Sequence, residues 1–448
     1  MNIRPEKELR DPIHGFIPIY GQELKIIQSP VFQRLRRVKQ LSFCYFIYHG
    51  AEHSRFGHAI GVMHLVDKAL TKINENSEKY NSLIKISNDD IKLARLAALL
   101  HDVGHYPFSH ALDKTNLIPE NHEKYSIALV KNHFGTFIEK EGIDPAQVTN
   151  LIEGKSNPEK PFLTTLINSQ IDTDKFDYLL RDSYYTGVKY GVYDLDRLLD
   201  SLFVTENGEL VILDKGFFAA EQFVLARYLM FGQVYIHKTK RCFEGLVKKA
   251  LEFLASKGKF EYPRTKDLSN ADEIKNFINL DDAWILGKIQ SITDSDMSHI
   301  PKAIQNREPF KKILDSEEIS QKMKMKKEGE DGSSYLKAIE EDLQYQLSKG
   351  SLESIGIKTE DILFDKASYL SYKLRPYSNP MPSTEKTEDP AAILIFNEKT
   401  KLKETIEERS KIIKILGEKV NLRRTYVYGS KQDALEKYLY EKYPDLKI

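Results

Sequence analysis

The sequence predicts a mainly α-helical fold with short β-hairpins and a mixed α+β C-terminal region. Through most of the first 260 residues, apolar side chains recur at helical spacing, as at Ile60, Met63, Val66, Leu70 and Ile73. Strand signals, in contrast, are short and are bounded by Gly, Pro or Asn. Because the helical stretches are many and the strand signals few, the main core should be built by helices packed on helices.

The strand signals of the first half stand at two places. Residues 10–20 combine Pro, Gly and β-branched residues, which favour a short strand or hairpin over a helix. Residues 202–206 and 209–213 flank Asn207-Gly208, a dipeptide that supplies the two positive-φ positions of a type I′ turn. The periodic stretches between these places predict helices at 30–41, 58–73, 91–103 (capped by Asp89 or Asp90), 122–133, 145–153, 162–182 and 217–257.

The C-terminal region changes in composition. Residues 321–334 are the most polar part, which indicates a solvated helix end and a mobile loop, with a regulatory tail as the alternative. Residues 376–390 carry four prolines among Ser, Thr and Glu and should form a surface loop. Strands are predicted at 391–396 and 423–428, and a charged helix follows each, at 401–418 and 431–442.

Composition narrows the class of protein. Lys+Arg and Asp+Glu both number 66, so the formal net charge is zero, which argues against a grip of the whole protein on nucleic acid. Cys44 and Cys242 are the two cysteines, too few for a disulfide framework, and this fits a reducing cytoplasm. No apolar run approaches the ~18 residues of a membrane span, and the first residues are charged. We therefore expect a cytoplasmic protein that does not enter a membrane.

Four residues could form a metal site. His101 and Asp102 close an apolar helix and open the sequence HDVGHYPFSH, while His58 stands in the first turn of an earlier helix and Asp174 begins a later one. Two imidazoles and two carboxylates can close around one divalent ion and leave positions open for water and substrate. Each residue also has a structural interpretation, as a helix cap or a core histidine. Their joint occurrence predicts a metal-dependent hydrolase, with Mn, Fe, Mg, Zn, Ni and Co all compatible.

The helix that follows Asp174 could carry several functions on one face. Asp174, Tyr178 and Asp182 are spaced i, i+4 and i+8, and Lys175 lies at the edge of the same face. One helix could therefore bring a metal ligand, a cation, a tyrosine and a second carboxylate to the same site. The alternative for Tyr178 is an ordinary buried core tyrosine.

Two further charged sets were expected to be structural. Asp177 and Arg181 lie on another face of that helix at i, i+4, which indicates a solvated salt bridge. The basic run at Arg34, Arg36, Arg37 and Lys39 should mix a solvated face with one or two structural pairs, a nucleotide contact by Arg36 or Arg37 being the alternative.

The ordered pattern of these segments resembles the HD-domain metal-dependent phosphohydrolases, in their deoxynucleoside triphosphate triphosphohydrolase branch. The resemblance covers roughly residues 9–250 and implies an HD-type helical core. The chain looks more like the bacterial form of the family, which carries no SAM domain before the catalytic region. The segments that carry it are Gln40-Leu41, GAEHSRFGH (50–58), HDVGHYPFSH (101–110), His122-Glu123 and DTDKFDYLLRD (172–182).

The resemblance implies a reaction and a set of residues for it. A dNTP would become a deoxynucleoside and inorganic triphosphate, through attack of metal-activated water on the α-phosphorus while His110 assists the leaving 5′-oxygen. One metal ion would be bound by His58, His101, Asp102 and Asp174. Phosphate contact or proton transfer would fall to His105, His110, His122 and Glu123.

The resemblance also implies substrate contacts. Lys175 and Tyr178 match triphosphate and sugar contacts, and Arg55 matches an arginine at the α-phosphate and base. Near the deoxyribose and the phosphates stand Gln40, Leu41, Asp182, Arg227 and Tyr235. His237 and Lys238 match positions that touch a regulatory nucleotide in tetrameric relatives.

The family further implies a homo-oligomer, a dimer or tetramer, and leaves open whether a nucleotide activator is needed. We divide the chain into a catalytic domain, 1–260, and a C-terminal α+β region, 261–448, for oligomerisation or regulation. Two other functions compete with the triphosphohydrolase: an HD-type phosphodiesterase or nucleotidase acting on another nucleotide, and a non-catalytic nucleotide-sensing protein. The released product separates the first, and the absence of turnover separates the second.

Overall fold

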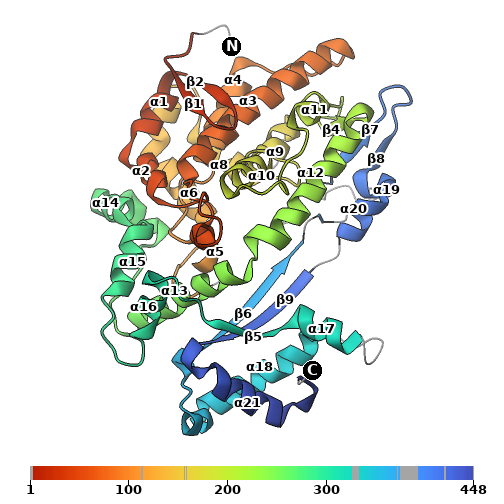
Figure 1. Ribbon diagram of the computed structural model, residues 1–448. Coiled ribbons are helices and arrows are strands. Elements are labelled where there is room, and N and C mark those ends of the chain that lie inside the picture. Colours follow the sequence, from red (N-terminus) through yellow and green to blue (C-terminus); the bar gives the residue numbers. More distant parts are fainter. Residues whose placement is uncertain are drawn as a thin grey trace.

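The computed structural model describes residues 4–112, 115–155, 157, 159–324, 332–370, 372–373, 392–417 and 420–446, with the backbone alone for 109, 110, 323 and 324. In this part of the chain helices dominate and the strands form three small sheets, which confirms the predicted fold class (Figure 1). None of the helices described is both long and apolar enough to cross a membrane.

The chain begins with an antiparallel hairpin of β1 (Lys7–Asp11) and β2 (Gly15–Ile19), as predicted but three residues earlier. Gly15 has a φ of +74°, which the tight turn requires. The helices α1 (Gly21–Gln28) and α2 (Pro30–Gln33) follow, and then a 3-10 turn over Arg34–Arg37.

The helix predicted over 30–41 is therefore wrong beyond residue 37. Val38 is extended, and Lys39 forms an isolated β-bridge with Ser54. The backbone N–H of Lys39 donates to the side chain of Asp282, far along the sequence, instead of to a helical carbonyl. A tertiary hydrogen bond thus takes the place of the local one.

Three helices form the centre of the helical core: α3 (Arg55–Lys79), α4 (Asn88–Leu100) and α10 (Thr173–Thr186). Helix α3 packs against both α4 and α10 and is buried along most of its length. The hydroxyl of Ser87 caps α4, and Asp90 completes a capping box from the third helical position. The predicted N-cap at Asp89 or Asp90 is therefore wrong, because the helix begins earlier in the sequence.

Two predicted helices are each divided. The stretch 162–182 contains α9 and α10 because the side chain of Asp172 caps a new helix and accepts the N–H of Lys175. The stretch 217–257 contains α12 and α13, which a π-helical turn over Phe231–Tyr235 and an N-cap by His237 separate. Of the helices in these divided stretches, the bounds are α9 (Pro161–Ile167), α12 (Phe217–Met230) and α13 (Lys238–Ser256). The other helices of this half are α5 (Ser109–Leu112), α6 (His122–Leu129), α7 (Gly135–Glu139), α8 (Pro145–Ile152) and α11 (Leu195–Leu199).

The predicted hairpin at 202–213 is confirmed as β3 (Leu202–Val204) and β4 (Leu210–Leu213), but the type I′ turn is wrong, because Gly208 has a φ of +76° whereas Asn207 has no positive φ. The chain returns to this hairpin much later, because β7 (Leu394–Phe396) pairs in parallel with β4 and carries β8 (Lys403–Thr405) on its other edge.

The helix predicted over 401–418 is therefore wrong at its start. Strand β8 occupies its first residues, and the rest is two short helices, α19 (Ile406–Arg409) and α20 (Lys411–Leu416). Ser410 ends the first helix, and its hydroxyl caps the second.

The C-terminal region holds the third sheet and a second hydrophobic core, at the bottom of Figure 1. Its strands run antiparallel in the order β5-β9-β6, with α17, α18 and α21 packed against them. The predicted strand at 423–428 and helix at 431–442 are present there as β9 and α21. The bounds are β5 (Lys311–Asp315), α17 (Ser316–Lys324), α18 (Gly332–Ser348), β6 (Ile362–Tyr369), β9 (Val420–Val427) and α21 (Gln432–Lys442).

Between the two cores lie α14 (Ala271–Asn279), α15 (Asp282–Gln290) and α16 (His299–Gln305), whose apolar residues join the main core. The division of the chain after residue 260 stays a prediction. The loop predicted at 376–390 lies outside the described residues.

Candidate metal centre

Three helix ends converge on one point of the helical core. His58 lies in the first turn of α3, His101 and Asp102 directly follow α4, and Asp174 lies in the first turn of α10. The Nε2 atom of His58 is 3.0 Å from Asp174 Oδ1 and 3.8 Å from Asp102 Oδ2. The Nε2 atom of His101 is 3.4 Å from Asp102 Oδ1 and 3.7 Å from Asp174 Oδ1. The four residues expected to bind metal thus lie together.

The two imidazoles present lone pairs to this point. His101 Nδ1 donates to the carbonyl of Ala98 (2.7 Å), and His58 Nδ1 donates to Asp177 Oδ2 (2.8 Å), so each ring carries its proton away from the centre. Both Nε2 atoms are buried, and among the described residues they face carboxylate oxygens at 3.0–3.7 Å without a hydrogen bond of good geometry. Buried polar atoms are normally paired, and two orphaned imidazole nitrogens beside two carboxylates fit a divalent ion.

The electrostatics of the centre favour a cation. Burial lowers the pKa of His58, but the carboxylates of Asp174 and Asp177 outweigh it and raise that pKa to about 10, so Nε2 attracts a proton wherever a metal ion does not take its place. Burial works to raise the pKa of Asp102, yet His105, His101 and Arg55 hold it well below its usual range. Carboxylates that stay ionised inside the protein create a negative potential, which a divalent ion would neutralise.

Asp177 contacts the ring nitrogen of His58 that faces away from the metal centre. Its Oδ2 receives both His58 Nδ1 (2.8 Å) and Arg181 Nε (2.8 Å), and its Oδ1 lies 2.6 Å from His14 Nε2 and 2.9 Å from Arg181 Nη2. Arg181 Nη1 in turn donates to Asp11 Oδ2 (2.9 Å). All five side chains are at least nine-tenths buried. The prediction of a solvated salt bridge is wrong. Asp177 and Arg181 belong to a buried network that orients His58, a candidate metal ligand.

A sequence signal for this network exists in α3. A Cβ atom on Gly61 would lie 2.0 Å from Asp177 Oδ1, and one on Gly57 would lie 3.3 Å from Arg181 Nη1. Two glycines four residues apart inside a long helix are costly unless a neighbouring group approaches closely. This spacing could have marked the face of α3 that receives the charged pair.

Two more histidines stand beside the centre. The rings of His105 and His122 stack at 3.8 Å with an interplanar angle of 11°, and His105 Nε2 lies 3.2 Å from Asp102 Oδ1. Burial, and then the charge of Arg55, lower the pKa of His105, which keeps this imidazole neutral. Burial raises the pKa of Glu123. The side chain of His110 lies outside the described part of the structure.

A second polar group lies two turns further along α10, around Asp182. Tyr235 Oη donates to Asp182 Oδ2 (2.9 Å), and His53 Nε2 lies 2.8 Å from Asp182 Oδ1. The ring of His53 stacks on Tyr185 at 4.5 Å, and the rings of Tyr178 and Tyr235 meet edge to face at 5.9 Å. The structure thus brings three of the expected substrate residues together and adds His53, which no sequence argument singled out.

The expected cations are engaged with protein groups. Arg55 Nη1 donates to Asp102 Oδ2 (2.6 Å), and Lys175 Nζ donates to Asp172 Oδ2 (2.7 Å). The guanidinium of Arg227 lies over the ring of Phe231 at 5.7 Å, and its Nε is buried without a partner among the described residues. Gln40 and Leu41 follow the extended segment at Lys39.

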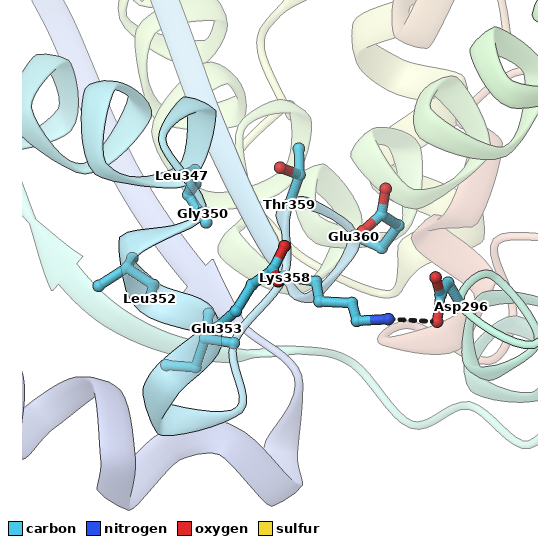
Figure 2. Close-up of a pocket in the computed structure, with 9 residues that line it drawn as sticks. Asp296, Leu347, Gly350, Leu352, Glu353, Lys358, Thr359 and Glu360 are labelled. Carbon is cyan, nitrogen blue, oxygen red and sulfur yellow. Dashed lines mark hydrogen bonds and ion pairs between the residues drawn. The ribbon is translucent and has the colours of Figure 1, made fainter.

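His237 and Lys238 take structural positions at the start of α13. His237 Nδ1 accepts the N–H of Thr239 (3.2 Å) as the N-cap, and Lys238 is exposed. A separate pocket of about 270 Å³ lies in the C-terminal region, where Lys358 donates to Asp296 (Figure 2). None of the expected site residues lines that pocket.

Comparison with known proteins agrees with this geometry. Residues 55–182 match the family model of the HD domain, and residues 193–371 match that of the HD associated region. An uncharacterized protein of Methanocaldococcus jannaschii is 36% identical over 63% of this chain and 57% of its own length. A deoxynucleoside triphosphate triphosphohydrolase SAMHD1 homolog of Dictyostelium discoideum is 30% identical over 68% of this chain and 58% of its own.

The chain therefore spans a little over half the length of these curated relatives. Among solved structures, a phosphohydrolase of Bacteroides thetaiotaomicron superposes with a TM-score of 0.72 at 27% identity, covering 94% of this chain and 99% of that one. With three helix ends bringing histidines and carboxylates together, and with both family models matched in order, the chain belongs to the HD-domain phosphohydrolase family.

Proposed function

We propose that this protein hydrolyses deoxynucleoside triphosphates to a deoxynucleoside and inorganic triphosphate. The observation that carries the proposal is the donor set of His58, His101, Asp102 and Asp174, with both Nε2 atoms unpaired and a stacked histidine pair beside it. The relative from Dictyostelium bears the name of such an enzyme. A divalent metal held by these residues would polarise a phosphoryl oxygen and lower the pKa of bound water.

The residues around the centre divide the remaining tasks. His105 and His122 lie beside Asp102, and either ring could hold or pass a proton at a phosphate oxygen through its own nitrogen, since face-to-face stacking leaves no N–H···N path between the two rings. Glu123, a carboxyl whose pKa burial raises, can hold a proton near that pair. Arg55 and Lys175, now bound to Asp102 and Asp172, are the cations nearest the centre, and a triphosphate would compete for them.

The polar group around Asp182 supports a nucleoside triphosphate as the substrate rather than a bare polyphosphate. Asp182 accepts from Tyr235 and also faces His53, so its carboxylate is oriented and can accept a hydroxyl of deoxyribose. Tyr178 lies against Tyr235 and offers a flat apolar face to the sugar ring. The same helix carries Asp174, which places the sugar contact and the metal ligand on one rigid element.

Analysis of products by ion-exchange chromatography tests the proposal. The protein would be incubated with each dNTP and Mn²⁺ or Mg²⁺, alone and in pairs. We expect inorganic triphosphate and deoxynucleoside in equal amounts. Turnover that needs two different dNTPs would indicate an activator nucleotide.

Other products would favour the competing functions. Release of monophosphate or of single phosphates would indicate an HD phosphodiesterase or nucleotidase. No turnover of any mixture would favour a nucleotide-sensing protein. Either result contradicts the proposed reaction.

His110 stays the candidate for assisting the leaving 5′-oxygen, as the family resemblance implies. Replacing it with alanine should lower kcat by at least about 100-fold, the usual range for loss of a general acid, while the metal content stays that of the unaltered protein. Turnover and metal analysis of the same sample check this. A kcat within about tenfold of the original, a barrier change under ~1.4 kcal/mol, would exclude the role.

The assembly and the setting of the enzyme are proposals of the same kind. We infer a homo-oligomer, a dimer or tetramer, whose activity a nucleotide activator at or near His237 and Lys238 could raise, in the cytoplasm. Sedimentation at several protein concentrations, with and without a dNTP, checks the oligomer.

A further inference from the structure

One carboxylate outside the metal centre joins the two segments that flank it. Asp282, at the start of α15, accepts the backbone N–H of Lys39 (2.9 Å) through Oδ2 and the backbone N–H of Phe108 (3.3 Å) through Oδ1. Lys39 directly precedes Gln40-Leu41, on the expected sugar side, and Phe108 stands in the loop 101–110, on the expected phosphate side. Asp282 is 6% exposed, so water does not compete for these bonds.

A buried arginine makes a second link at the same place. Arg34 Nε donates to the carbonyl of Leu280 (2.8 Å), and Arg34 Nη1 donates to the carbonyl of His105 (2.7 Å). The guanidinium lies 4.2 Å from the ring centre of Phe277 and is wholly buried. The turn between α14 and α15 is therefore bonded to the loop of the metal centre through two independent side chains.

The loop segment that Asp282 holds is strained. Phe108 has a φ of +52°, a left-handed conformation that bulky residues rarely adopt. Its ring is buried and stacks on Phe43 at 4.8 Å with an interplanar angle of 7°. Such a backbone persists only where its surroundings hold it, and sites of this kind cluster at functional positions.

We propose that Asp282 is a positioning residue of the active site, whose carboxylate keeps the segment at Lys39–Leu41 and the loop 105–110 at one fixed separation. The residue lies in the HD associated region, and this gives that region a part in shaping a site whose metal ligands all come from the HD domain. The effect on catalysis rests on the proposed function, whereas the effect on the two segments does not.

The test compares Asp282→Ala and Asp282→Asn in the full chain. Hydrogen exchange would report on residues 38–42 and 105–110, and steady-state kinetics on kcat and KM for a dNTP. For Asp282→Ala we expect exchange at least about tenfold faster in both segments. We also expect kcat about 100-fold lower with KM changed less than about threefold, because misplaced groups slow the reaction more than they weaken binding.

For Asp282→Asn, exchange and kcat should lie between those of the unaltered protein and of Asp282→Ala. The amide oxygen can accept one of the two N–H groups, while the NH₂ group faces the other. The matched control is Asp361→Ala, another buried carboxylate that accepts a backbone N–H, from Lys358 (2.9 Å), away from the metal centre. It should lower the melting temperature, yet leave kcat and exchange in the two segments unchanged.

Unchanged exchange in both segments of Asp282→Ala would overturn the proposal, as would a kcat equal to that of Asp361→Ala. If the unaltered protein hydrolyses no dNTP, the proposed function fails, and the exchange comparison still decides the positioning role. If Asp282→Ala does not fold, the same two measurements on Asp282→Asn decide it.

Discussion

Asp102→Ala should abolish turnover and remove the bound metal. Asp102 Oδ2 receives Arg55, and its Oδ1 lies within 3.4 Å of the Nε2 atoms of His101 and His105, so this one carboxylate touches the metal-binding and the proton-transfer groups alike. Its loss leaves Arg55 as an uncompensated positive charge beside the site, which repels a cation. We expect kcat to fall at least about 10⁴-fold, a barrier increase of at least ~5.4 kcal/mol.

Elemental analysis of the purified variant and product analysis with each dNTP measure the two effects. The control is Asp200→Ala, a partly exposed carboxylate whose partner is Lys215. Surface pairs of this kind contribute about 0–1 kcal/mol, so metal content and kcat should be unchanged. An Asp102→Ala protein that keeps one metal per chain and a kcat within tenfold would contradict the metal assignment.

Asp177→Asn should lower both the stability of the protein and its metal affinity, although Asp177 is not expected to bind the metal. The carboxylate balances buried Arg181 and orients His58. Removing one partner of a buried ion pair costs about 3–5 kcal/mol of unfolding free energy. Loss of the group that orients a ligating histidine usually weakens metal binding by about 10- to 100-fold.

A double variant separates the two effects. In Asp177→Asn with Arg181→Met, the cation that Asp177 balanced is gone, but Asp11 loses its partner Arg181, so the unfolding free energy should recover only in part. The metal affinity should stay low, because the hydrogen bond that orients His58 remains altered. Denaturant unfolding of the metal-free proteins and metal titration measure these quantities. Full stability and full metal affinity in Asp177→Asn would show that the network is dispensable.

Local patterns in the sequence were sufficient for the helical core. The period of apolar residues in α3 and α4 and the Asn-Gly turn of the β3–β4 hairpin depend on neighbours within a few positions. The order of His58, His101, Asp102 and Asp174 also indicated the family, and the structure brings His58, His101 and Asp174 within ligand distance of one another, with Asp102 beside both histidines.

The errors occur where distant parts of the chain compete with local preferences. The helix predicted over 30–41 stops early because Lys39 bonds to Asp282, and the helix predicted over 401–418 begins as a strand because β7, its partner, pairs with β4. A hydrogen bond to a residue hundreds of positions away leaves no periodic signal.

The sequence by itself therefore determined the class of fold, the family and the candidate metal ligands, because those follow from short-range spacing and from residue chemistry. Only the tertiary structure decided what surrounds the metal centre. The i, i+4 pair of Asp177 and Arg181 looks the same in the sequence whether water or the protein covers it, and the close approach of α10 to Gly61 placed it inside. Because the pair is shielded from water, its charges interact far more strongly than those of a solvated salt bridge. Asp177 is thereby fixed in place and orients His58, a candidate metal ligand.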